Sequence, residues 1–148
     1  MLEELFANKI LIAGLIAWGL AQLLKTPFEY LWTRRWNWGA MFNSGGMPSS
    51  HSALMTSTTL AIGLFSGFDT PAFAIAVATS MVVIYDAAGV RRQAGIHAEK
   101  INLLFRELFS GHPVSQELLK EVIGHTPRQV IAGIALGITV AVLTWLAA

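Results

Sequence analysis

The chain contains no cysteine and few charged side chains. Among its 148 residues, Asp, Glu, Lys and Arg together make up 13%, and the net charge at pH 7 is +1. Without thiols there is no disulfide framework and no cysteine ligand or nucleophile, so any chemistry must use His, Ser, Lys, Arg or carboxylate side chains. No basic run resembles a nucleic-acid patch, and we expect no nucleic-acid partner.

Hydrophobic residues, in contrast, are abundant. They make up 54% of the chain and gather in blocks close to the length of about 20 residues that crosses the hydrocarbon core of a bilayer. The four blocks cover residues 5–24, 50–68, 71–90 and 127–147. We therefore predict an all-α membrane protein of about four transmembrane helices, with residues 1–148 forming one membrane-embedded domain. The first block is long enough to be a retained helix and not a cleaved signal peptide.

The polar connections have the composition of a membrane surface. The first connection, residues 25–47, mixes Trp with Arg, which is typical of the interface between lipid and water. Residues 96–109 place apolar side chains at helical spacing among charged ones, and residues 115–123 do so more weakly. The pattern predicts one or two amphipathic helices lying in the interface.

Basic residues are concentrated in the first and third connections, and the second has none. They are Lys25, Arg34, Arg35, Arg91, Arg92, Lys100, Arg106 and Lys120. The positive-inside rule places both of these connections in the cytoplasm. We expect an integral protein of the cell's inner or plasma membrane whose reactive residues lie on the cytoplasmic face.

Small residues recur at four-residue spacing in the first and last blocks. They are Ala13, Ala17 and Ala21 in the first block, and Gly133 and Gly137 in the last. Small side chains let helices approach closely. The pattern predicts tight helix contacts, and the same faces are candidates for a homo-oligomer.

The predicted topology brings reactive side chains from several helix ends to one face. They are Lys25, His51, Asp86, Arg91, Arg92 and His125. Ionisable groups at this depth are costly and usually functional, which favours an anion site. Ser49 and Ser50 begin the second block, where free backbone N–H groups bind phosphate. Thr126 and Gln129 form a capping-box pattern that places His125 just before a helix start.

Paired histidines beside an anion site are suited to phosphoryl transfer. One imidazole can attack phosphorus and the other can protonate the leaving oxygen, while cationic groups hold the phosphate oxygens. This chemistry needs neither a metal ion nor another cofactor.

Three segments carry a resemblance to a known family. The first is residues 45–53, which include Pro48-Ser49-Ser50-His51, and the others are residues 85–95 and 124–130. The similarity runs over nearly the whole chain. The chain resembles the divergent branch of the type-2 phosphatidic acid phosphatase superfamily, the acid phosphatase/vanadium-dependent haloperoxidase-related membrane proteins. The resemblance implies that His51 is the general acid, that Ser49 and Ser50 contact phosphate, and that His125 supplies the nucleophile.

Other positions depart from the superfamily pattern. Lys25 has no Arg-Pro at the expected spacing, Leu119 stands in place of an Arg, and Gln129 stands in place of the Asp that orients the nucleophile. We expect Arg91 and Arg92 to supply the missing guanidinium groups. We expect either Asp86 or Glu121 to supply the missing carboxylate.

The expected function is hydrolysis of a membrane lipid phosphate or diphosphate through a phosphohistidine. The alternative is a non-catalytic membrane scaffold, or an anion-binding transporter subunit, that retains the phosphate cradle. A channel is disfavoured because the charges cluster at one face. Each polar residue also has a structural alternative: the histidines can cap their helices, and Arg91 and Arg92 can anchor a helix at lipid headgroups.

Overall fold

The computed structural model describes residues 2–42, 45–108 and 124–148, and within these ranges it contains helices and no strand. The elements are α1 (Leu2–Ala7), α2 (Lys9–Thr33), the 3₁₀ helix η1 (Trp38–Phe42), α3 (Ser50–Ser66), α4 (Pro71–Ala88), α5 (Val90–Leu108) and α6 (Pro127–Leu146). The predicted all-α membrane fold is confirmed. The second short helix expected at residues 115–123 lies outside the described residues.

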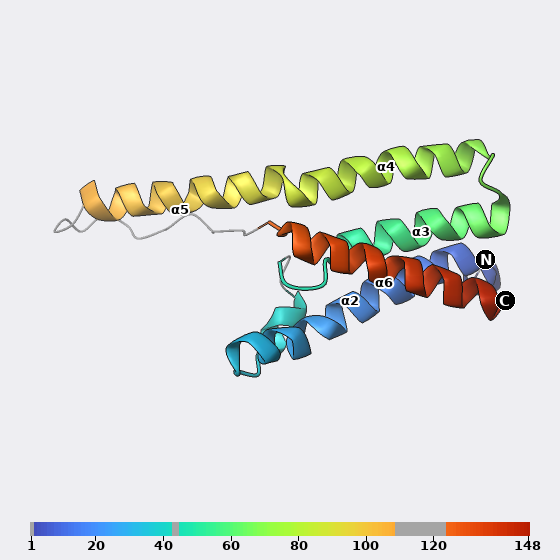
Figure 1. Ribbon diagram of the computed structural model, residues 1–148, viewed down its shortest axis with the longest axis horizontal. Helices are drawn as coiled ribbons and strands as arrows, with labels where there is room; N and C mark the ends of the chain where they lie inside the picture. Colours follow the sequence, from blue (N-terminus) through green and yellow to red (C-terminus); the bar gives the residue numbers. More distant parts are fainter. Residues whose placement is uncertain (1, 43–44, 109–123) are drawn as a thin grey trace.

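α3 is the central helix of the bundle. It packs against α2, α4 and α6, and α2 also contacts α6. Figure 1 shows both termini at the same end as the turn between α3 and α4, while α3 and α6 begin at the other end. α5 continues the line of α4 past the rest of the bundle. It is the predicted amphipathic helix, and its place in the membrane interface stays a prediction.

Three of the described helical stretches are long and apolar enough to cross a membrane. They are Lys9–Thr33, Pro71–Arg106 and Pro127–Leu146. The fourth predicted crossing corresponds to α3, which has 17 residues and therefore lies at the short end of the spanning range. α3 ends at Ser66 because the next residue, Gly67, adopts a φ of 106°. Only glycine adopts this φ without strain.

The first predicted block, residues 5–24, differs from α2 at both ends. Asn8 interrupts the helix, and its side chain accepts a hydrogen bond from the Leu11 N–H at 3.0 Å, so that α2 starts at Lys9. At the other end α2 continues through Pro27 to Thr33, and Lys25 is inside the helix and not at its end. Polar contacts hold this extension, since Asn37 Nδ2 donates to Glu29 Oε1 at 3.1 Å.

Small residues form the core, as their spacing predicts. Ala13, Ala17 and Ala21 have no exposed area, and Gly137 lies so close to α3 that a Cβ atom would come within 2.6 Å of the Ala53 carbonyl oxygen. The predicted close helix contacts are confirmed, and they lie within the chain. These faces are therefore occupied by contacts within the chain, and the homo-oligomer stays a prediction.

Hydroxyl groups on α3 form hydrogen bonds to neighbouring helices. Ser57 Oγ donates to the Ala13 carbonyl of α2 at 3.0 Å, and Thr59 Oγ1 lies 2.6 Å from Ser80 Oγ of α4. Polar groups in a bilayer need internal partners. A central helix supplies them, which explains why α3 contains more Ser and Thr than the helices around it.

Candidate functional site

His51 and His125 come together at one end of the bundle. His51 is in the first turn of α3 and His125 precedes α6, and their ring centroids lie 6.2 Å apart. His125 is 2% exposed, whereas His51 is half-buried. The two histidines that the sequence places in separate segments therefore share one site.

Ser49 begins α3 and joins it to α6. The Ser49 N–H donates to the Gln129 carbonyl at 3.0 Å. The Ser49 hydroxyl oxygen accepts from the Ser52 N–H at 3.3 Å and from Ser52 Oγ at 3.0 Å. Ser49 is thus the N-cap of the helix that carries His51, and the group that it can offer a phosphate is its O–H.

The end of α4 closes the site from a third side. The His125 N–H donates to the Ala87 carbonyl at 3.0 Å, which places the C-terminal turn of α4 beside the start of α6. Asp86, the residue before Ala87, is half-buried. The predicted convergence of α3, α4 and α6 at one end is observed.

Gln129 contacts His125 directly. Gln129 Oε1 accepts the Thr126 N–H at 2.8 Å and lies 3.4 Å from His125 Nδ1. The first contact belongs to the capping box predicted for Thr126 and Gln129, which is present. The capping box predicted from the sequence already indicated that the Gln129 side chain folds back toward Thr126, but its contact with His125 is not predicted there.

The remaining candidates are placed to different extents. Lys25 is buried, and a Cβ atom added at Gly46 would lie 3.5 Å from its Cγ and Cδ atoms, so its stem packs against the segment that leads into α3. Ser50 is buried in the first turn of α3. Arg91 and Arg92 belong to the first turn of α5, but the description does not extend to their side chains. Glu121 lies outside the described residues.

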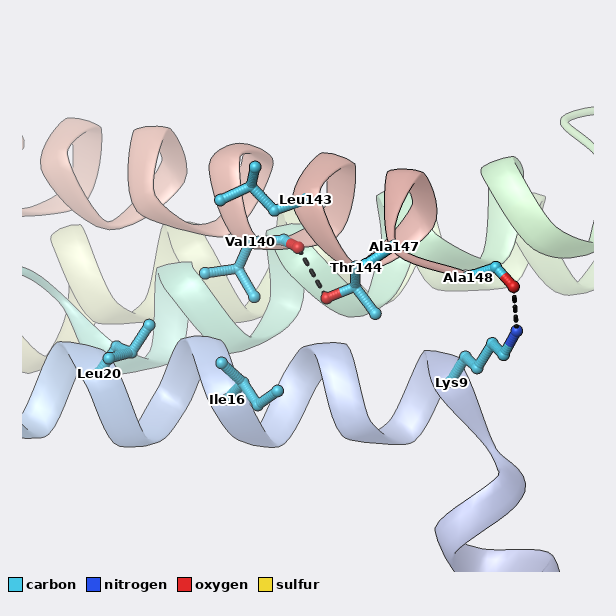
Figure 2. Close-up of a pocket in the computed structure, with 8 residues that line it drawn as sticks. All are labelled: Lys9, Ile16, Leu20, Val140, Leu143, Thr144, Ala147 and Ala148. Atoms are coloured by element: carbon cyan, nitrogen blue, oxygen red, sulfur yellow. Dashed lines mark hydrogen bonds between the residues drawn. The ribbon is translucent and has the colours of Figure 1, made fainter.

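Two further observations concern possible metal ligands and a groove that lies away from the histidines. Across the described ranges, no group of three or more His, Asp or Glu side chains gathers as metal ligands would. A groove of about 470 Å³ runs between α2 and α6, where Lys9 Nζ donates to the Ala148 carbonyl at 3.0 Å. Figure 2 shows mostly apolar side chains facing it, and none of the candidate site residues lines it.

These features define a helical membrane protein with a paired-histidine site at one end of its bundle. Comparison with known proteins agrees with this class. The chain belongs to the Divergent PAP2 family, whose model matches residues 6–140. It is 34% identical over 146 residues to the "Uncharacterized membrane protein YuiD" of Bacillus subtilis (strain 168), covering 91% of this chain and 92% of that protein. No solved structure matches the chain.

Proposed function

We propose that the protein is a metal-independent membrane phosphatase that hydrolyses a lipid phosphate or diphosphate through a phosphohistidine. The observation that carries the proposal is the pairing of His51 with His125 at 6.2 Å between ring centroids. This separation brings both imidazoles within reach of the same phosphoryl group. Membership of the Divergent PAP2 family supports the same chemistry.

In the proposed first step, the lone pair of His125 Nε2 forms a bond to phosphorus. The bond between phosphorus and the lipid oxygen breaks, and that oxygen takes a proton from the His51 imidazolium. For a diphosphate, the leaving oxygen belongs to the lipid monophosphate. In the second step water attacks phosphorus, His51 takes a proton from the water, and the N–P bond breaks to release inorganic phosphate and free His125.

Cationic and N–H groups stabilise the phosphate oxygens in this proposal. The first turn of α3 presents the backbone N–H groups of Ser50 and His51 at the positive end of the helix dipole. Ser49 contributes its hydroxyl and Lys25 its ammonium group. Arg91 and Arg92, at the start of α5, are assigned the guanidinium role, because Arg binds phosphate oxygens through two parallel donors.

Lipid is the proposed substrate class because of where the site lies. The histidines occupy the end of a bundle whose helices expose large apolar side chains, including Ile75, Met81 and Val82 on α4. A substrate whose tail stays in the bilayer presents its phosphate at that depth. The proposed face is cytoplasmic, because the basic connections share that end of the bundle.

A phosphate-release screen tests the proposal. Purified protein in lipid vesicles is given phosphatidic acid, phosphatidylglycerophosphate and a polyprenyl diphosphate, with a His125→Ala preparation as the control. We expect release of inorganic phosphate from at least one of them by the wild-type protein alone. Binding without release would favour the alternative, a scaffold or anion-binding subunit, which the departures at Leu119 and Gln129 from the superfamily pattern also favour.

A further inference from the structure

Gln129 contacts both segments that carry the paired histidines. Its side-chain oxygen lies 3.4 Å from His125 Nδ1, and its backbone carbonyl accepts the N–H of Ser49, the N-cap of the helix that carries His51, at 3.0 Å. Gln129 therefore contacts one histidine through its side chain. It also holds the helix of the other through its backbone.

The contact with Thr126 determines which atom of the amide faces His125. The Thr126 N–H is a donor, so the Gln129 side-chain atom 2.8 Å from it must be the oxygen. The same oxygen faces His125 Nδ1, and an oxygen acceptor needs a donor there. A hydrogen bond at this contact requires the hydrogen on Nδ1, which leaves the lone pair of the neutral imidazole on Nε2.

We infer that Gln129 is a positioning residue that holds His125 in the tautomer with a hydrogen on Nδ1 while leaving the imidazole neutral. The tautomer follows from the hydrogen bond, and the neutrality follows from the amide, because an uncharged acceptor stabilises imidazolium far less than a carboxylate does. The inference rests on the proposed function for its purpose, since only a neutral imidazole attacks phosphorus.

Other charged or titratable groups lie on the elements around His125 in both the wild-type protein and its variants. They are His51 on α3, Asp86 on α4, Lys25 on α2 and Arg128 on α6. Changing Gln129 alone leaves these groups in place. The effect of an amide compared with a carboxylate beside Nδ1 can therefore be measured as a difference between two proteins.

Gln129→Glu is the informative variant, because Glu is a regular capping-box residue and keeps the acceptor for the Thr126 N–H. It adds one negative charge beside His125. Arg128→Gln is the matched control, since it changes the net charge by the same amount at an exposed neighbour in the same helical turn. Gln129→Leu removes the acceptor from both contacts and leaves the backbone bond to Ser49.

The measurement is nitrogen NMR of ¹⁵N-histidine-labelled protein in lipid nanodiscs, with the His125 signals assigned from a His125→Gln variant. In the wild type we expect the tautomer with a hydrogen on Nδ1. In Gln129→Glu we expect the midpoint of the His125 titration to rise by about one pH unit or more, with a much smaller change in Arg128→Gln. Gln129→Leu should populate both tautomers.

Two results would overturn the inference: a wild-type His125 with its hydrogen on Nε2, or a titration midpoint in Gln129→Glu no higher than in Arg128→Gln. Neither readout needs turnover. If the NMR results are as expected but no lipid phosphate is hydrolysed, Gln129 positions His125 and the proposed phosphatase activity fails. If hydrolysis is observed without the titration shift, the activity stands and the role of Gln129 fails.

Discussion

His51 and His125 differ in burial although their rings lie close together. His125 is 2% exposed, which shields a phosphoryl bond to it from bulk water, while the half-buried His51 can exchange protons with solvent. This difference supports the assignment of His125 as nucleophile and His51 as acid and base. The residue that forms the covalent bond is needed for every substrate, whereas the acid is needed only as far as the leaving oxygen requires a proton.

Replacement of each histidine by Ala therefore has a different expected result. His125→Ala should abolish phosphate release from lipid phosphates and from p-nitrophenyl phosphate alike. His51→Ala should slow the lipid phosphates by roughly 10²–10⁴-fold, the range of general acid catalysis, and slow p-nitrophenyl phosphate much less. Initial rates of both variants on both substrates test this, and near-normal turnover by His125→Ala on either substrate contradicts the nucleophile assignment.

Chelation and vanadate distinguish histidine chemistry from metal chemistry. Because the proposed reaction uses imidazole as both nucleophile and acid, EDTA should leave the rate unchanged. Orthovanadate, which adopts the five-coordinate geometry of the transition state, should inhibit competitively with substrate. The rate is measured before and after dialysis against EDTA, and a loss that Mg²⁺ or Zn²⁺ reverses would be incompatible with the mechanism.

The sequence predicts both histidines as candidate site residues, but it does not predict that Gln129 contacts His125. The motif around His51 and the position of His125 before Pro127 are local patterns, and the structure brings the two rings together as predicted. The sequence does not predict the contact between Gln129 and His125, because the Gln129 side chain turns back toward Thr126 and His125 only within the capping box. In the structure, the group beside His125 Nδ1 is the side-chain amide of Gln129. The roles expected for Asp86 and Glu121 remain predictions.

For the helices, the predicted starts agree with the structure better than the predicted ends. α4 begins at Pro71 and α6 at Pro127, as predicted, because Thr70 and Thr126 precede them as N-caps. The predicted end of α2 is too early, because the mixture of Trp and Arg in residues 25–47 is typical of a membrane interface and α2 continues into it to Thr33. In the structure Tyr30 contacts Trp36, with 5.4 Å between ring centroids. This contact supports the last turns of α2, and no pattern in the sequence predicts it.

The close approach of α6 to α3 makes Gly137 sensitive to a single methyl group. A Cβ atom there would meet the Ala53 carbonyl oxygen at 2.6 Å and the Ser57 nitrogen at 3.0 Å. These are backbone atoms that cannot rotate away. Gly137→Ala should destabilise the bundle by about 1–3 kcal/mol, the usual penalty for overpacking, measured as a lower midpoint of thermal unfolding in detergent.

Gly19→Ala is the control for that substitution. Gly19 lies in α2, and a Cβ atom there would meet nothing within 4 Å. Since Ala is the better helix former, we expect an unfolding midpoint equal to or above that of the wild type. Equal losses in Gly19→Ala and Gly137→Ala would mean that helix propensity, and not the contact between α3 and α6, determines the effect.

For the molecule as a whole, the arrangement predicts which face of the membrane carries the site. α5 and the starts of α3 and α6, where the paired histidines lie, are at one end, and the turn between α3 and α4 is at the other (Figure 1). The chain lacks cysteine, so exposed Gln93 of α5 and exposed Ser66 beside the turn can each be replaced by a single Cys. With a membrane-impermeant thiol reagent on intact cells, we expect labelling of Ser66→Cys and protection of Gln93→Cys.

Permeabilised cells provide the control, because both cysteines should then react. The reverse pattern in intact cells, with Gln93→Cys labelled and Ser66→Cys protected, would place the site outside the cell. A substrate presented on the outer leaflet would follow from that result.

The alanine and glycine core has a thermodynamic consequence for how the protein responds to heat. In a bilayer, large side chains such as Leu15, Ile75 and Leu143 contact lipid when the helices are packed, and they still contact lipid when the helices separate. Separation therefore exposes little apolar surface to water, and such exposure is the source of the large heat-capacity increase when soluble proteins unfold. The free energy of helix separation should accordingly change almost linearly with temperature, without the maximum near room temperature that the hydrophobic effect imposes on soluble domains.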